Sequence, residues 1–146
     1  MEKRQKIKKI LSPIKSNFDF HDLLQVIIGA CILAVPVGFT KEVWELGESL
    51  PILNIIILIF LTLLFICIFS YFHYHKEHMH TNPSYHLSEL AKRTLVTYIF
   101  SFIIVAILLS LIQVTPWVTE PLVALKRIVI VTFPSSIGAA ISDVLK

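Results

Sequence analysis

A chain of 146 residues that is 55% hydrophobic and only 16% charged has too little polar side-chain surface for a water-soluble protein, and its length suits one domain. The net charge of +3 comes mainly from basic residues that flank apolar stretches, which favours membrane orientation over nucleic-acid binding. Cys31 and Cys67 both lie within apolar stretches, so they offer no disulfide framework and no metal-binding spacing.

Residues 1–22 form a basic N-terminal segment with an amphipathic pattern. Lysines occupy one face of the helix that the pattern predicts, until Pro13 interrupts it. The apolar residues of the other face are Ile7, Ile10, Leu11 and Ile14. We predict an interfacial helix on the inner leaflet that binds anionic lipid. The alternative is a basic tail that only sets the orientation of the protein.

Four apolar stretches predict membrane-spanning helices at about residues 23–40, 52–72, 94–114 and 122–144. Each is close to the roughly 20 apolar helical residues that cross a bilayer core about 30 Å thick. The predicted fold class is therefore an all-α polytopic membrane protein, with one four-helix domain at residues 23–146. Between spans two and three, residues 73–93 are predicted to form a histidine-rich cytoplasmic loop.

The distribution of basic residues predicts the orientation. Ten of the 13 lysines and arginines fall on the side of the N-terminus, namely Lys3, Arg4, Lys6, Lys8, Lys9, Lys15, Lys76, Lys92, Arg93 and Lys146. The other side has Lys41, Lys126 and Arg127. This bias predicts that both termini are cytoplasmic, in the plasma membrane of a prokaryote. Trp44 and Trp117 then share the outer boundary, where indole rings prefer to lie.

Spans one and four contain prolines and small residues. Pro36 and Pro134 leave the carbonyl groups of Ile32 and Ile130 without their helical hydrogen bonds, so both helices are expected to be irregular. Discontinuous helices often mark binding sites in transporters, whereas small residues also permit close helix packing, and both interpretations stay open. The residues concerned are Pro36, Gly38, Pro134, Ser135, Ser136 and Gly138.

Charged residues lie at the ends of the same two spans. Glu42 and Glu45 share a face if the first helix continues, while Lys126 and Arg127 stand just before the apolar run of span four. We predict an ion pair between these two groups, which either locks the bundle or forms part of an ion pathway. Asp143, near the inner end of span four, is a similar but weaker candidate.

Histidines are concentrated between spans two and three. In an extended segment, His73 with His75 and His78 with His80 place imidazoles on the same side, a spacing that suits zinc or another transition metal. On a helix these pairs diverge. The segment lacks thiolates and a fixed four-ligand spacing, so a solvated interfacial loop without a cofactor is the preferred interpretation. A pH-sensing role is a further alternative.

Two segments resemble a family of prokaryotic integral membrane proteins of unknown function. They are the run Phe-Thr-Lys-Glu-Val-Trp-Glu-Leu-Gly at residues 39–47 and the run Phe-Pro-Ser-Ser-Ile-Gly-Ala-Ala-Ile-Ser-Asp at residues 133–143. The resemblance implies a small multi-span protein and no particular activity. The positions that it marks include Glu42, Trp44, Pro134, Gly138 and Asp143.

No catalytic or nucleotide-binding motif stands out in the sequence, so we expect a protein that is not an enzyme. Four short spans leave little room for a pore within one subunit. We therefore expect an ion channel or small transporter formed by a homo-oligomer. The alternative is a membrane scaffold that transports nothing, or a sensor of metal or pH that uses the histidine-rich loop.

Overall fold

The computed structural model describes residues 20–77 and 83–145, and this part of the chain is helical. Its elements are α2 (Phe20–Gly38), α3 (Lys41–Ser49), α4 (Ile52–Glu77), α5 (Pro83–Leu111) and α6 (Pro121–Val144). The predicted interfacial helix in residues 1–22 lies almost wholly outside the described residues, as do His78 and His80.

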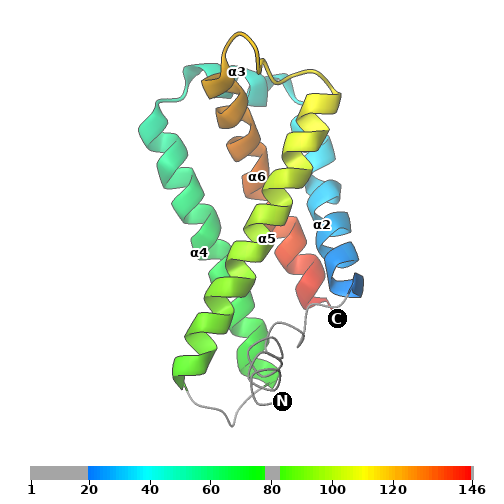
Figure 1. The fold of residues 1–146 in the computed structure, drawn as a ribbon, viewed down its shortest axis with the longest axis vertical. Coiled ribbons are helices and arrows are strands. Elements are labelled where there is room, and N and C mark those ends of the chain that lie inside the picture. Colours follow the sequence, from blue (N-terminus) through cyan, green and yellow to red (C-terminus); the bar gives the residue numbers. More distant parts are fainter. Residues whose placement is uncertain (1–19, 78–82, 146) are drawn as a thin grey trace, which may run out of the picture.

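The four long helices stand side by side and alternate in direction (Figure 1). The short helix α3 lies across one end of the bundle together with residues 112–120, and we call this the α3 end. At the opposite end α2 begins and α6 ends, and we call this the Asp143 end. All four long helices are long and apolar enough to cross a membrane, which confirms the predicted fold class.

Helix boundaries differ from the prediction between spans two and three. Helix α4 continues beyond residue 72 to Glu77, and α5 already begins at Pro83, so most of the predicted loop at 73–93 is helical. Hydropathy marks where the apolar residues end, whereas a helix continues until a residue breaks its hydrogen bonding. This stretch contains no glycine, and its one proline stands at the start of α5, where proline is tolerated.

Helix α3 is separate from α2 because the chain leaves the helix after Pro36 and Gly38. Thr40 adopts an extended conformation, with φ −84° and ψ 134°, and α3 then begins at Lys41. The Trp44 indole Nε1 donates a hydrogen bond to the Gly38 carbonyl at 3.0 Å, which satisfies a carbonyl at the end of α2. Glu42 and Glu45 therefore lie on the separate helix α3 and not on a continuation of span one.

Helix α6 forms the centre of the bundle, because it packs against α2, α3, α4 and α5. Within the described structure, 50% of the residues in the most apolar stretch of α6 are buried, against 17% of those in the corresponding stretch of α4. Large apolar side chains such as Phe60 and Phe72 of α4 point away from the bundle and are exposed. The membrane lipid is the natural contact for such side chains.

Helices α2 and α6 approach each other at Gly29 and Gly138. A Cβ atom on either glycine would overlap the carbonyl oxygen of the other. One turn away, the Ser135 hydroxyl donates a hydrogen bond to the Ala30 carbonyl at 3.1 Å. The small residues of spans one and four therefore pack against each other within one subunit, as close membrane helices do.

Both inner prolines are accommodated without interrupting their helices. Helix α2 continues through Pro36 to Gly38, and α6 continues through Pro134 to Val144, so the predicted irregular helices are not observed. The contact between α2 and α6 holds both helices in place, which compensates for the hydrogen bond that each proline removes.

Candidate functional site

Arg127 holds together three segments at the α3 end. Its Nε donates to the Trp44 carbonyl at 3.2 Å, its Nη1 donates to the Val114 carbonyl, and its Nη2 pairs with the Glu48 carboxylate at 2.5 Å. The Arg127 side chain is 12% exposed, so these partners replace the water that the guanidinium has lost. One cation thus joins α3, α6 and the connection after α5.

The shape and position of α3 suit this arrangement. A Cβ atom at Gly47 would overlap Cγ of Arg127, so the glycine leaves the space that the arginine stem occupies. Lys126 donates to the carbonyl of Leu50, the residue that caps the C-terminus of α3, at 2.8 Å. Pro51 follows and cannot continue the helix. Both basic residues therefore hold α3 on the bundle.

The predicted basic side of this ion pair is correct, and its predicted acidic side is wrong. Arg127 pairs with Glu48, which the sequence pattern did not indicate, and not with Glu42 or Glu45. Glu45 instead makes an exposed pair with Lys41 at 3.5 Å, and Glu42 is exposed. The reason is the break before α3, since the new helix turns Gly47 and Glu48 toward α6.

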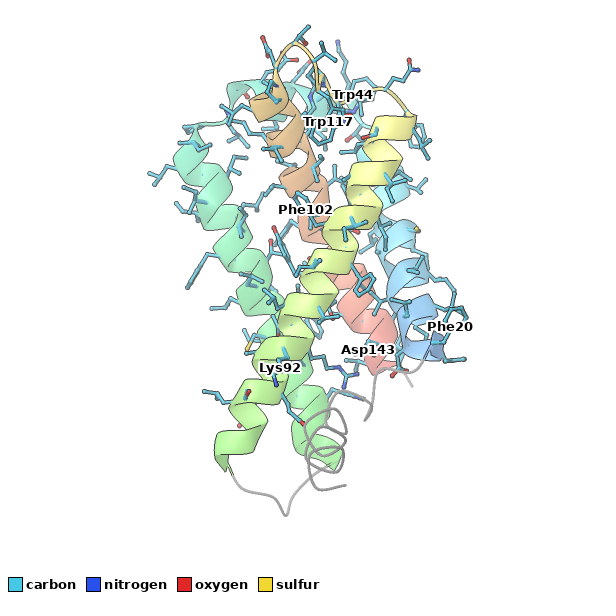
Figure 2. All side chains as sticks on the ribbon, viewed as in Figure 1. Phe20, Trp44, Lys92, Phe102, Trp117 and Asp143 are labelled. Atoms are coloured by element: carbon cyan, nitrogen blue, oxygen red, sulfur yellow. The ribbon has the colours of Figure 1, made fainter. Side chains whose placement is uncertain are left out.

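A second ion pair lies at the Asp143 end. Arg93 of α5 donates from Nε and Nη2 to Oδ2 of Asp143, at 3.0 and 2.6 Å. The side chains are 20% and 9% exposed, so both charges are largely withdrawn from solvent. Figure 2 shows Asp143 at the end of the bundle opposite to Trp44 and Trp117, which share the α3 end as the sequence predicted.

The contact between α2 and α6 also fixes which residues lie at the level of Asp143. The Gly29 backbone lies against Gly138 and Ser142 of the antiparallel α6. Gln25 is one helical turn, about 6 Å, from Gly29 toward the start of α2, which brings it to the level of Asp143. Thr94 directly follows Arg93 on α5. The buried Asp22 lies on the same face of α2 as Gln25.

Several oxygen atoms at this level are buried without a hydrogen-bond partner among the described residues. They are Oε1 of Gln25, Oγ1 of Thr94 and Oδ1 of Asp143. A buried polar atom without a partner costs about 1–3 kcal/mol, so three at one level are unusual in a settled core. We call Gln25, Thr94 and Asp143 the oxygen cluster.

Hydroxyl groups extend from the oxygen cluster toward the middle of the bundle. Apart from Thr115 at the α3 end, the buried hydroxyl residues of the described chain are Thr62, Thr94, Thr97, Ser101, Thr132, Ser135 and Ser136. Thr62 and Thr132 donate to carbonyls one turn earlier in their own helices. Ser101 Oγ, like the oxygen cluster, is buried without a partner in the described part of the chain. The interior is therefore polar on the side of the Asp143 end.

Chemically, the oxygen cluster suits a ligand that accepts electron pairs. The guanidinium nitrogens Nε and Nη2 of Arg93 are committed to Oδ2 of Asp143, so the open positions are oxygens. Carboxylate, amide and hydroxyl oxygens are the ligands that hard cations prefer. The set is small for Ca²⁺, which takes about six to eight oxygens, and its single carboxylate, already paired with Arg93, supplies little negative charge for a divalent cation.

Asp143 was predicted as a site residue from the sequence, whereas Arg93, Gln25 and Thr94 were not. Arg93 counts there only as a cytoplasmic charge, because the apolar run begins at residue 94. A helix drawn back to Pro83 would have placed Arg93 inside α5 and opposite Asp143. Single polar residues such as Gln25 and Thr94 carry no sequence signature, and only the packing of α2, α5 and α6 places them at the level of Asp143.

The structure gives the predicted histidine site little support. Positions 73 and 75 belong to the helix α4 and are about 200° apart around its axis, so the extended spacing does not apply to them. His78 and His80 lie outside the described residues. Within residues 20–77 and 83–145, no group of three or more histidine, cysteine, aspartate or glutamate residues is arranged to hold a metal.

The chain matches the family "Putative integral membrane protein (DUF2391)" over residues 1–145, which confirms the resemblance of its two motifs. No curated protein and no solved structure matches the chain. The family match covers nearly the whole sequence, and four described helices are able to cross a membrane. The chain therefore belongs to this family of integral membrane proteins.

Proposed function

We propose that the protein transports a small alkali cation across the membrane and binds it at the oxygen cluster. The observation that carries this proposal is the buried Asp143 carboxylate, whose Oδ1 has no partner in the described structure while Oδ2 is bound to Arg93. Ionisable groups in membrane helices are costly, and they commonly mark ion pathways. The neighbouring oxygens of Gln25 and Thr94 supply neutral ligands.

The closed ends of the bundle favour a transporter over an open channel. At the α3 end, Arg127 joins α3, α6 and the connection at Val114. At the Asp143 end, the pair with Arg93 joins α5 and α6. Between the ends, α2 and α6 are in backbone contact at Gly29 and Gly138. Transport then requires that one end opens while the other stays closed.

A cation that binds Asp143 provides a reason for such opening. Arg93 and the cation compete for the same carboxylate, so binding weakens the contact between α5 and α6. A ligand shifts a conformational equilibrium only by its difference in affinity for the two states. The competition with Arg93 is the source of that difference in this mechanism.

The proposal includes a homo-oligomer and an orientation. Four short helices enclose little space, so we propose that subunits assemble and that the exposed apolar face of α4 takes part. We further propose that the Asp143 end faces the cytoplasm of a prokaryotic cell, as the bias of basic residues favours. Labelling of cysteines introduced at Glu48 and Glu120 from the outside tests the orientation, and labelling only from the inside contradicts it.

Ion flux in liposomes tests the proposed function. Purified protein should accelerate the uptake of sodium or potassium ions, and Asp143→Asn should reduce the rate at least tenfold. Glu45→Gln is the matched control, because Glu45 is a carboxylate in an exposed ion pair far from the oxygen cluster. The absence of alkali-cation flux under any gradient contradicts transport and favours a membrane scaffold. Flux of anions alone contradicts the proposed cargo.

A further inference from the structure

A cavity whose chemistry differs from that of the oxygen cluster lies between α4, α5 and α6 near the α3 end. It has a volume of about 460 Å³ and is lined chiefly by apolar side chains, among them Ile56, Ile59, Phe102 and Leu125. This volume falls within the roughly 300–1,000 Å³ that is typical of sites for small molecules. We call this cavity the apolar groove. It is separate from the oxygen cluster, which lies at the opposite end of the bundle.

One charged residue lines the apolar groove, and that residue is Lys126. Its ammonium group donates to the Leu50 carbonyl at 2.8 Å and makes no ion pair with a carboxylate of the described residues. The adjacent Arg127 differs, because Glu48 balances its charge. Lys126 therefore places a partly buried positive charge, with no carboxylate partner among the described residues, where the apolar groove reaches the α3 end.

This order of chemistry matches one kind of ligand. A phospholipid has its anionic phosphate at the membrane boundary and its acyl chains directly below. In the apolar groove, Lys126 lies at the boundary, where it meets the phosphate, and the isoleucines and Phe102 lie deeper, where they meet an acyl chain. A second copy of the chain fits less well. In a symmetric contact across the groove, the same patch meets itself, which brings two Lys126 ammonium groups toward each other.

We infer that the apolar groove binds one acyl chain of an anionic phospholipid and that Lys126 binds the phosphate of its headgroup. The groove is open to the surrounding lipid on its α4 and α5 rims, where Ile56 and Ile99 are 56% and 46% exposed. The lipid therefore enters sideways and needs no rearrangement of the helices. Bound in this way, it fills the space between α4 and α5 at the α3 end.

Native mass spectrometry of the purified protein tests this site. The protein is reconstituted with equal amounts of phosphatidylglycerol and phosphatidylcholine of the same chain length and is then released in detergent. We expect one phosphatidylglycerol to be retained at least tenfold more often than phosphatidylcholine. Lys126→Gln should remove this one bound phosphatidylglycerol, whereas Lys41→Gln, at an exposed lysine near the same end, should keep it.

A second pair of variants keeps the test decisive if loss of Lys126 disturbs α3. Ile56→Trp fills the rim of the groove and should remove bound lipid, with Lys126 intact. Ile57→Trp is the matched control, since Ile57 is equally exposed, at 56%, and does not line the groove. Equal retention of both lipids, or retention that is unchanged in Ile56→Trp, overturns the inference. So does a wild-type dimer that Ile56→Trp converts to a monomer, which assigns the groove to a second copy.

Discussion

Each end of the bundle is closed by an arginine, and the two arginines differ in how well their surroundings are satisfied. Arg127 has two backbone carbonyls and a carboxylate, and that carboxylate, Glu48, is 62% exposed. Arg93 has one carboxylate oxygen of Asp143, whose other oxygen is buried without a partner in the described chain. Native cores rarely leave such groups open, so the difference supports a structural role for Arg127 and the binding role that we propose for Asp143.

The largest expected effect on stability comes from the loss of Arg127. Arg127→Gln should lower the free energy of unfolding by about 3–5 kcal/mol, because three partners in α3 and the connection after α5 lose a buried cation. Denaturant unfolding in detergent micelles measures this change. Glu48→Gln should cost less than about 1 kcal/mol, since Glu48 is mostly exposed and the bonds to carbonyls remain. Equal costs for both changes would make the ion pair, and not the carbonyls, the main contribution.

Gly47→Ala tests the fit between α3 and Arg127. The added Cβ overlaps Cγ of Arg127, so we expect a loss of about 1–3 kcal/mol in unfolding free energy. The clash depends on the arginine, which gives the measurement an internal control. In an Arg127→Ala background the same glycine change should cost much less, and a double-mutant cycle measures the difference. Additive effects would show that Gly47 is needed for another reason.

Asp143→Asn should have a smaller effect on stability and a large effect on transport. We expect a cost of about 1–2 kcal/mol, because Arg93 is partly exposed near the bundle end and its long side chain is able to reach water. Flux and denaturant unfolding are measured on the same preparations. An additional Arg93→Gln change should restore part of the stability but none of the flux. Recovery of flux in the double variant would reduce the pair to a structural role.

Thr94→Val should have the smallest effect on stability. Unlike the other changes, it is not expected to destabilise the protein. The hydroxyl has no partner among the described residues, so its removal should leave stability unchanged or raise it by up to about 1 kcal/mol. A ligand role for the same hydroxyl predicts that cation flux falls several-fold. Thr62→Val is the control, because the Thr62 hydroxyl bonds to its own helix at the Leu58 carbonyl. Unchanged flux in Thr94→Val would remove Thr94 from the oxygen cluster.

The number and approximate positions of the membrane-spanning helices were predictable, because they depend on the lengths of the apolar stretches. Four spans follow from hydropathy because a bilayer of fixed thickness demands them. The ends of α4 and α5 do not, since polar residues continue a helix beyond the hydrocarbon. The separate helix α3 after the break at Phe39 and Thr40 was not predicted either, because a proline and a glycine near a helix end permit both a kinked helix and a new one.

The candidate site was predictable only at its charged residues. Asp143, Lys126 and Arg127 are noticeable in the sequence because charged residues within membrane-spanning helices are rare. Their partners depend on how helices rotate against one another, which is why Glu48 replaces Glu42 and Glu45, and why Arg93 was missed. The small residues of spans one and four left packing and a binding site open as alternatives, and the contact between Gly29 and Gly138 agrees with packing. Whether an oxygen such as that of Thr94 has a partner is a property of three packed helices together.

Direct binding of an alkali cation to the purified protein tests the central claim most closely. Isothermal titration calorimetry with sodium and potassium chloride, against choline chloride as the control for ionic strength, measures it without any assumption about transport. The account predicts saturable binding of one alkali cation per subunit that is lost in Asp143→Asn and weakened in Thr94→Val, with Glu45→Gln unchanged. Binding that is absent in the wild type, or that persists unchanged in both variants, would contradict it.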